Sequence, residues 1–118
     1  MLSKLLKSKL HHLRVTRSDP EYSGSLLIDE DLMDAAGILN WEKILVANLD
    51  NGERFETYAI AGKRGSRVCC LNGAAACKGK LGDRLIVMTW ALLNEAETRV
   101  HTPTIVVLDA DNNPKQTP

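Results

Sequence analysis

The sequence predicts a mainly β fold, namely a small β-barrel with short accessory helices. Polar and apolar residues alternate in several short runs, which is the period-two pattern of half-buried strands. Asn51-Gly52 separates two of these runs, and this dipeptide is strongly typical of a β-hairpin turn. The helical patterns cover no more than about two turns each, so a helical bundle and an α/β sheet are both disfavoured.

The first of about six expected strands covers residues 9–17. Strict alternation there would place Lys9, His11, Leu13 and Val15 on one face. The other strands are expected at residues 43–49, 53–60, 67–71, 85–90 and 104–108.

The second strand of the predicted hairpin carries several polar side chains. Arg54, Glu56, Tyr58 and Ile60 would share one face of it. Thr57 would therefore point to the opposite face, unless the strand is bulged or ends there.

Two short helices and a polar tail complete the prediction. Asp29 can cap a helix that continues to Ala36, and Gly37 stands where such a helix ends. Asn72-Gly73 leads into three alanines, which favour a second short helix. Residues 112–118 are expected to form a polar, frayed tail.

Composition excludes several classes of protein. The 118 residues correspond to a single domain that can bury its own core. Lysine plus arginine and aspartate plus glutamate both total 15, so a polybasic nucleic-acid-binding surface is not indicated. The two tryptophans, two tyrosines and one phenylalanine are too few for a base-stacking platform.

The same features predict a cytoplasmic protein with no membrane span. No apolar run approaches the roughly 18 residues of a transmembrane helix. Lys4, Lys7 and Lys9 interrupt any apolar region of a signal peptide. Three cysteines are an odd number, which fits a reducing compartment.

The cysteines and the neighbouring histidines do not form a metal motif. Cys69, Cys70 and Cys77 lack the paired spacing of a zinc site. Adjacent residues on a strand point to opposite faces, so neither Cys69-Cys70 nor His11-His12 is expected to converge on one ion. We therefore predict no metal and assign the cysteines to apolar packing.

The pair Gly24-Ser25 permits one specific reaction. A serine hydroxyl can attack the carbonyl of the preceding residue and replace the amide by an ester. Glycine in front allows backbone angles that other residues resist. β-Elimination from the ester would cut the chain, and hydrolysis would leave a pyruvoyl group at the new N-terminus. A plain loop is the alternative.

Three further features could serve a small anionic substrate. Arg54 offers a permanently charged fork that suits a carboxylate. Tyr58 has an ordinary pKa of about 10, so it can donate a proton at neutral pH. The backbone N–H groups of residues 72–75 could hold an anion. Each is equally compatible with an ordinary structural role.

In their order and spacing, these residues resemble the aspartate 1-decarboxylase family, pyruvoyl enzymes that make β-alanine. The resemblance extends from Lys9 to at least Asp83. The matching residues are Lys9-Leu10-His11, Tyr22-x-Gly24-Ser25, Asp34-Ala35-Ala36-Gly37-Ile38-Leu39, Asn51-Gly52-x-Arg54-Phe55-x-Thr57-Tyr58-Ala59-Ile60-Ala61, Arg64-Gly65-Ser66-Arg67, Asn72-Gly73-Ala74-Ala75-Ala76 and Gly82-Asp83.

The resemblance implies a six-stranded double-psi β-barrel and a homotetramer with active sites between subunits. It implies an inactive proenzyme that cuts itself between Gly24 and Ser25. The products would be a β-chain of residues 1–24 and an α-chain of residues 25–118 whose first residue becomes the pyruvoyl group. A maturation factor could assist the cleavage. The alternatives are a family member that stays uncut and a non-catalytic β-barrel that binds DNA or protein.

The implied reaction is the decarboxylation of L-aspartate to β-alanine and CO2, which feeds pantothenate and coenzyme A synthesis. The pyruvoyl ketone would form a Schiff base with the substrate amine and accept the electrons released with CO2. By the same resemblance, Tyr58 would then protonate the substrate α-carbon. Thr57 would stabilise the oxyanion of self-cleavage and could also contact substrate.

The resemblance also implies the substrate contacts. Arg54 and Lys9 would hold the two carboxylates, with His11 as a polar wall. Residues of the loop after the fourth expected strand would contact or support the substrate: Asn72, Gly73, Ala74 and Ala75. Ala47 is a departure, because some relatives carry an aromatic residue there, and the smaller side chain could alter substrate preference.

Charge is distributed unevenly about the implied cut. Residues 1–24 hold five basic and two acidic residues, a formal charge of +3, so residues 25–118 carry the balancing −3. Two ordinary solvated faces would explain this. We predict instead that the asymmetry helps to keep the two pieces together after cleavage.

Overall fold

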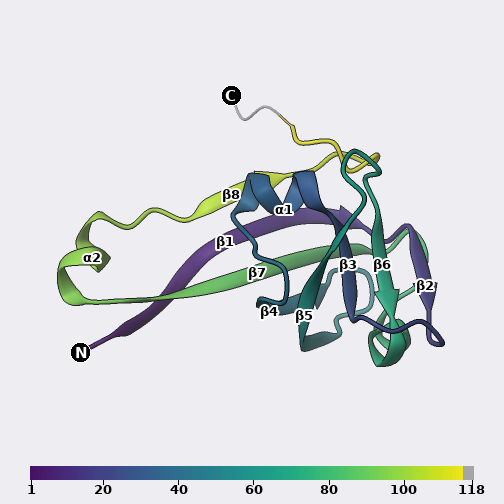
Figure 1. The fold of residues 1–118 in the computed structure, drawn as a ribbon, viewed down its shortest axis with the longest axis horizontal. Helices are drawn as coiled ribbons and strands as arrows, with labels where there is room; N and C mark the ends of the chain where they lie inside the picture. Colours follow the sequence, from purple (N-terminus) through teal and green to yellow (C-terminus); the bar gives the residue numbers. More distant parts are fainter. Residues whose placement is uncertain (116–118) are drawn as a thin grey trace.

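The computed structural model describes residues 1–115, which form strands joined by short helices (Figure 1). This confirms the mainly β prediction and the absence of a long helix among these residues. The elements are β1 (Ser3–Arg14), β2 (Arg17–Asp19), β3 (Leu26–Asp29), α1 (Glu30–Ala36), β4 (Lys43–Asn48), β5 (Arg54–Gly62), β6 (Cys69–Asn72), the 3-10 helix η1 (Gly73–Lys78), β7 (Arg84–Leu93), α2 (Glu95–Val100) and β8 (Thr104–Val107).

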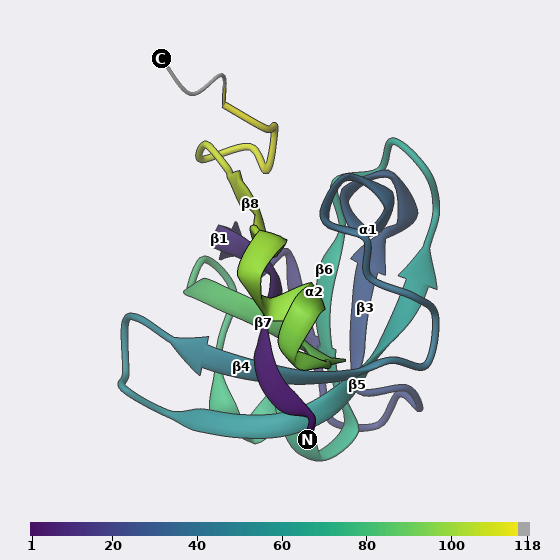
Figure 2. The ribbon, with the colours of Figure 1, turned by 90° about the vertical axis from the view of Figure 1, so that its left-hand side faces the viewer.

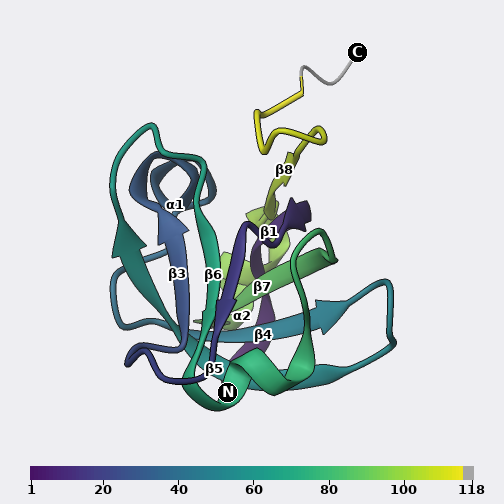
Figure 3. The same ribbon diagram turned by 90° about the vertical axis from the view of Figure 1, so that its right-hand side faces the viewer.

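The described strands form one eight-stranded sheet in the order β2-β6-β3-β5-β4-β7-β1-β8. The sheet is mixed, because β2 pairs with β6, β3 with β5 and β1 with β8 in parallel, whereas the other pairs are antiparallel. Each parallel pair joins segments that are distant in sequence. Figure 3 shows β3 and β6 side by side, although β4 and β5 come between them along the chain.

The hairpin and the first helix form as the sequence predicts. β4 and β5 pair antiparallel about the Asn51-Gly52 turn, in which Gly52 has φ 77°. Helix α1 is capped by the Asp29 side chain and ends at Gly37, which takes the left-handed conformation at φ 71°. Glycine tolerates that conformation without the steric cost of a Cβ.

The core lies between the sheet and helix α1. Leu10, Val46 and Val87 are fully buried on adjacent strands, and Leu32 and Met33 of α1 are buried with them. Each such side chain contributes about 1.5–3 kcal/mol when it leaves water. The core-facing residues of β1, β7 and β4 are therefore fixed, and their neighbours along each strand must face outward.

The first strand differs from the prediction in bounds and in phase. It covers Ser3–Arg14, and its pairing with β7 shifts register between His11 and Leu13. His12 has φ 68°, so one extra residue bulges out of the ladder. The bulge turns Leu13 into the core while His11 stays on the outer face, so the predicted shared face of Lys9, His11, Leu13 and Val15 is wrong.

The same bulge overturns the expectation that His11 and His12 diverge. Their rings stack with centroids 4.0 Å apart and an interplanar angle of 22°. Positive φ at His12 brings its side chain back beside its neighbour. Both pKa values are lowered, chiefly because burial disfavours the charged imidazolium.

Beyond Trp90 the structure adds an element that the sequence analysis missed. β1 and β7 form a long ribbon that ends at α2, which Figure 2 shows from that end. Asn94 accepts a hydrogen bond from the Glu97 N–H group, and the Glu97 side chain accepts one from the Asn94 N–H group. This capping box at Asn94-x-x-Glu97 is the sequence signal that could have identified the helix.

The predicted tail is wrong over part of its length. Asn112 is buried, and its side chain accepts from the Arg14 N–H group at 2.7 Å and donates to the Arg14 and Arg67 carbonyls at 3.0 Å each. Pro114 forms a bridge with Leu108. Residues 116–118 of the predicted tail lie outside the described residues.

Cys69 and Cys70 are buried and Cys77 is exposed. Burial raises the pKa of the Cys69 thiol far above its usual range. Within residues 1–115, no cluster of three or more His, Cys, Asp or Glu side chains could hold a metal ion. None of the helices described here is long and apolar enough to cross a membrane.

Candidate active site

Ser25 lies immediately before β3, at the end of the bend that contains Gly24. Gly24 has φ +93°, a conformation that residues with a Cβ rarely adopt. A Cβ built there would lie 3.7 Å from Ile60 Cγ1, an ordinary contact. The position therefore requires glycine for its backbone conformation and not for lack of space.

Two groups from neighbouring strands hold Ser25. The Thr57 hydroxyl on β5 donates a hydrogen bond to the Ser25 hydroxyl. The Asn72 N–H group at the end of β6 donates to the Ser25 carbonyl at 3.0 Å. These contacts follow from the sheet, because β3 pairs with both β5 and β6 through Leu26. The side chain and the carbonyl of Ser25 are therefore both oriented.

The start of η1 packs against the same bend. Asn72 is buried, and Gly73 has φ +61° with its Cβ position 3.5 Å from the Tyr22 carbonyl oxygen. Ala75 is buried while Ala74 is exposed. The β6–η1 junction thus contacts the chain on both sides of Gly24.

Thr57 faces the core side of β5, as predicted, because it pairs with the buried Ile44. Tyr58 is therefore on the outer face of the strand, where its side chain is partly exposed. Its ring stacks on Trp41 with centroids 5.8 Å apart. Trp41 is an aromatic neighbour that no sequence pattern indicated.

The remaining predicted site residues share this outer face. His11, Ile86, Ala47 and Arg54 occupy one row across β1, β7, β4 and β5, through three successive register pairs. Four strands in a row place His11 and Arg54 about 14 Å apart.

Lys9 lies in the adjacent outer row, across from Met88, Leu45 and Glu56. Arg54 is exposed, and within the described chain neither it nor Lys9 forms an ion pair or a side-chain hydrogen bond. Both cations are thus available to an anionic ligand. The His11 Nδ1 atom is buried without a hydrogen-bond partner.

The predicted site therefore divides into two groups in the described chain. Gly24, Ser25, Thr57 and the Asn72–Ala75 loop form one group. Lys9, His11, Arg54 and Tyr58 form the second, on the outer face of the β1-β7-β4-β5 part of the sheet. Arg54 is five residues along β5 from Ala59, the partner of Leu26, which corresponds to roughly 17 Å. Within residues 1–115, no hydrogen bond or ion pair joins the groups.

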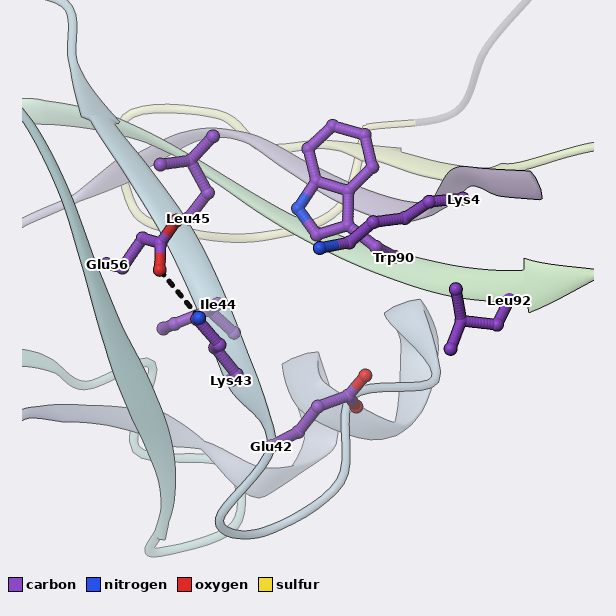
Figure 4. A pocket seen from close by; sticks show the side chains of 8 residues that line it. All are labelled: Lys4, Glu42, Lys43, Ile44, Leu45, Glu56, Trp90 and Leu92. Atoms are coloured by element: carbon purple, nitrogen blue, oxygen red, sulfur yellow. Dashed lines mark ion pairs between the residues drawn. The ribbon is translucent and has the colours of Figure 1, made fainter. Parts of the chain in front are cut away.

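A cavity of about 290 Å³ opens on the same outer face (Figure 4). Lys43 and Glu56 form an ion pair at 2.7 Å across it, and the Lys4 side chain runs beside the Trp90 indole. None of the predicted site residues lines this cavity. Its lining residues are Lys4, Glu42, Lys43, Ile44, Leu45, Glu56, Trp90 and Leu92.

Comparison with known proteins decides the family. A sequence model described as aspartate decarboxylase matches residues 1–115. The chain belongs to the aspartate decarboxylase family. An aspartate 1-decarboxylase of Syntrophobacter fumaroxidans is 56% identical over 110 residues, which is 93% of this chain and 89% of that protein.

Other relatives in the aspartate decarboxylase family give the same result. One from Caldicellulosiruptor saccharolyticus is 54% identical over 96% of this chain and 88% of its own length. One from Desulfotalea psychrophila is 50% identical over 98% of both chains. Both are named aspartate 1-decarboxylase, which confirms the family resemblance drawn from the motifs.

Proposed function

We propose that this chain is a carboxy-lyase that converts L-aspartate to β-alanine and CO2 after cutting itself between Gly24 and Ser25. One observation carries the proposal. In a member of this family, the Ser25 hydroxyl receives a hydrogen bond from Thr57 while the Ser25 carbonyl receives one from the Asn72 N–H group.

Self-cleavage follows from the chemistry of Ser25. Its hydroxyl oxygen attacks the Gly24 carbonyl carbon, and the acyl group moves from the Ser25 nitrogen to that oxygen. Loss of the Ser25 α-proton then expels the Gly24 carboxylate and leaves dehydroalanine. Its enamine form rearranges to an imine, and water releases ammonia. The new N-terminus is a pyruvoyl group.

The contacts of Ser25 fit this sequence of steps. Thr57 aligns the attacking hydroxyl. As the attack proceeds, we propose that the Thr57 hydroxyl turns to donate to the oxyanion on Gly24, where a positioned donor has its largest effect. The Asn72 N–H group polarises the Ser25 carbonyl, which makes the adjacent α-proton more acidic. Left-handed backbone at Gly24 lets the carbonyl and the hydroxyl approach each other.

When formed, the pyruvoyl group would supply a ketone that takes the substrate amine and accepts the electron pair released with CO2. Arg54 binds one substrate carboxylate through its planar fork. Lys9 provides a second positive charge for the dianion. Tyr58 donates the proton to the substrate α-carbon. The lowered pKa of His11 keeps its ring neutral at pH 7, which suits a polar wall.

The division of these residues into two groups supports assembly as part of the function. We propose that the chain forms a homotetramer in which the outer face of one subunit, with Lys9, Arg54 and Tyr58, approaches Ser25 of a neighbour. Within each subunit, we propose that the mixed sheet closes as a six-stranded double-psi β-barrel. The parallel pairs β2/β6 and β3/β5, which connect distant segments, support that closure.

Denaturing mass spectrometry of the purified chain tests the proposal. We expect two species, residues 1–24 and residues 25–118, with the larger lacking the Ser25 amine. Borohydride reduction in the presence of aspartate should add the substrate to the larger species. The same sample should release CO2 from L-aspartate, and incubation with a cell lysate would reveal any maturation factor by faster cleavage.

The control is Ser25→Ala, which should stay intact and inactive. A wild-type chain that stays intact and makes no β-alanine, even in lysate, would overturn the proposal. Salt-sensitive DNA binding by that intact chain, unchanged by Ser25→Ala, would instead indicate a binding module.

A further inference from the structure

A buried pair of polar side chains lies at the far end of η1 from Ser25. Asn48 at the end of β4 is 2% exposed, and Asp83 just before β7 is 6% exposed. The Asn48 amide donates to the Asp83 carboxylate at 2.9 Å. We refer to these two side chains as the Asn48–Asp83 clamp.

The clamp holds the backbone where η1 ends. The Asn48 amide also donates to the Lys78 carbonyl at 3.1 Å, and the Asp83 carboxylate accepts from the Lys80 N–H group at 3.0 Å. The Asn48 side-chain oxygen accepts from the Asp50 N–H group at 2.9 Å. Both donors and the acceptor of the Asn48 amide are therefore used, which makes it a specific connection between the hairpin turn and the η1 segment.

Because Gly79 has no side chain, the Asn48 amide can lie close to the backbone at residue 79. A Cβ at this position would lie 3.0 Å from Asn48 Nδ2 and 2.6 Å from Leu71 Cδ1. The φ of Gly79 is −170°, which any residue can adopt. Glycine is therefore needed at position 79 for close packing against Asn48 and Leu71, and not for its backbone conformation.

The position of η1 depends on its two ends. Six residues of 3-10 helix have little stability of their own. The first end is fixed by β6 and by the contact between Asn72 and Ser25. The second end is held by Asn48 and Asp83. It is held in addition by the Asn51 amide, which donates to the Lys78 carbonyl at 2.9 Å, and by the Ser18 hydroxyl, which lies 3.3 Å from the Ala76 and Gly79 carbonyl oxygens. If the second end moves, the Asn72–Ala75 loop between Ser25 and the clamp can move with it.

From this geometry we infer that Asn48 and Asp83 are positioning residues for the Ser25 site. They act through η1 and set how the Asn72 N–H group meets the Ser25 carbonyl. The inference rests on the proposed self-cleavage. Neither residue touches Ser25, so their effect reaches the reacting atoms only through the Asn72–Ala75 loop.

Two variants disturb the clamp in different ways. Asn48→Ala removes the amide, whereas Asp83→Ala keeps the amide and removes the carboxylate that it contacts. We expect each variant to slow appearance of the 25–118 species at least tenfold, measured by denaturing mass spectrometry at a temperature where the protein stays folded.

Thr89→Val is the matched control. Thr89 is buried and hydrogen-bonds the Ser8 hydroxyl between β1 and β7, so its loss also breaks a buried polar contact. It touches neither η1 nor Ser25. We expect it to lower the unfolding temperature while the cleavage rate changes less than twofold.

The outcomes separate the inference from the proposed function. A wild-type chain that does not cut itself overturns both. If the wild type is cut and both clamp variants are cut at its rate, the inference alone is wrong. It is equally wrong if cleavage slows in proportion to the loss of thermal stability in all three variants, because the clamp would then have a purely structural effect.

Discussion

Thr57 donates its hydroxyl hydrogen to the hydroxyl of Ser25, although the two residues are 32 positions apart. β3 and β5 run parallel beside each other, and this pairing creates the contact. The relationship places a fixed donor at Ser25, whose preceding residue, Gly24, takes a left-handed conformation.

Replacing Thr57 by valine should slow self-cleavage by about 10²–10³-fold, because it removes one positioned donor while keeping the side-chain shape. Intact mass after timed incubation measures the effect. Thr57→Ser restores a hydroxyl and should recover most of the rate. Equal rates for the valine and serine variants would contradict the role of the hydroxyl.

Mixing defective subunits tests whether the outer face serves a neighbour. Ser25→Ala chains cannot form the pyruvoyl group, and Arg54→Ala chains lack the carboxylate-binding fork. When the two variants are co-expressed in equal amounts, the mixture should regain about a quarter of the wild-type activity. In a symmetric oligomer, about one interface in four would join an intact Ser25 to an intact Arg54. Each variant alone should remain inactive or require much more aspartate. Activity that never exceeds the sum of the separate variants would show that both groups act within one chain.

Asp29 should make the stability of the protein depend on pH. It is fully buried. Burial alone would raise the pKa of Asp29, but N–H groups of Arg67, Asp31 and Gly65 and the Arg67 charge together lower it below its usual 3.8. The stabilisation is therefore complete above that value and is lost as pH falls through the lower folded-state pKa.

Asp29→Ala leaves these N–H groups without their acceptor and should cost about 3 kcal/mol in the free energy of unfolding at pH 7. Asp29→Asn keeps an acceptor and should cost less. Denaturant unfolding between pH 7 and pH 3 measures both. A wild type that loses no more stability than the asparagine variant over that range would contradict the prediction.

Once the chain is cut, we can test whether the charge of residues 1–24 helps to hold the two pieces together. Lys7 pairs with Glu42 at 2.7 Å, so one of the bases before the cut contacts an acid beyond it. Lys7→Met should lower the denaturant concentration that separates the pieces, by an amount equivalent to about 1 kcal/mol for a partly buried ion pair. Lys4→Met should have a smaller effect. A double variant that carries both Lys4→Met and Lys7→Met leaves Lys9 unchanged. Gel filtration in denaturant measures separation. If neither change matters, strand pairing alone holds the pieces.

The sequence predicted those parts of the fold that depend on neighbouring residues. Asn51-Gly52 determined the hairpin, Asp29 and Gly37 determined the bounds of α1, and alternation along β5 separated Thr57 from Arg54 and Tyr58. These features follow from local backbone preferences and from the two-residue period of a strand. The residues of a single segment are therefore enough to predict them.

The remaining features depend on contacts between distant segments. The bulge at His12 has no signature in the alternating run, and it reverses the phase of the strand after His11. Parallel pairing of β1 with β8, and of β2 with β6, joins segments that no local pattern relates. The division of the site residues also follows from such long-range pairing. β3 pairs with β5 and β6 at Ser25, and β1, β7, β4 and β5 pair in turn across the outer face, so motifs alone could not predict it.

The sheet order also bears on what happens if the chain is cut at Gly24. β2 is at one end of the order and β1 lies second from the other, so both ends of the sheet are built on residues that precede the cut. Folding must therefore come first, as a process within a single polypeptide. Once cut and then unfolded, the two polypeptides could regain the structure only by meeting again, and recovery would depend on their concentration. Maturation would thus be a one-way event.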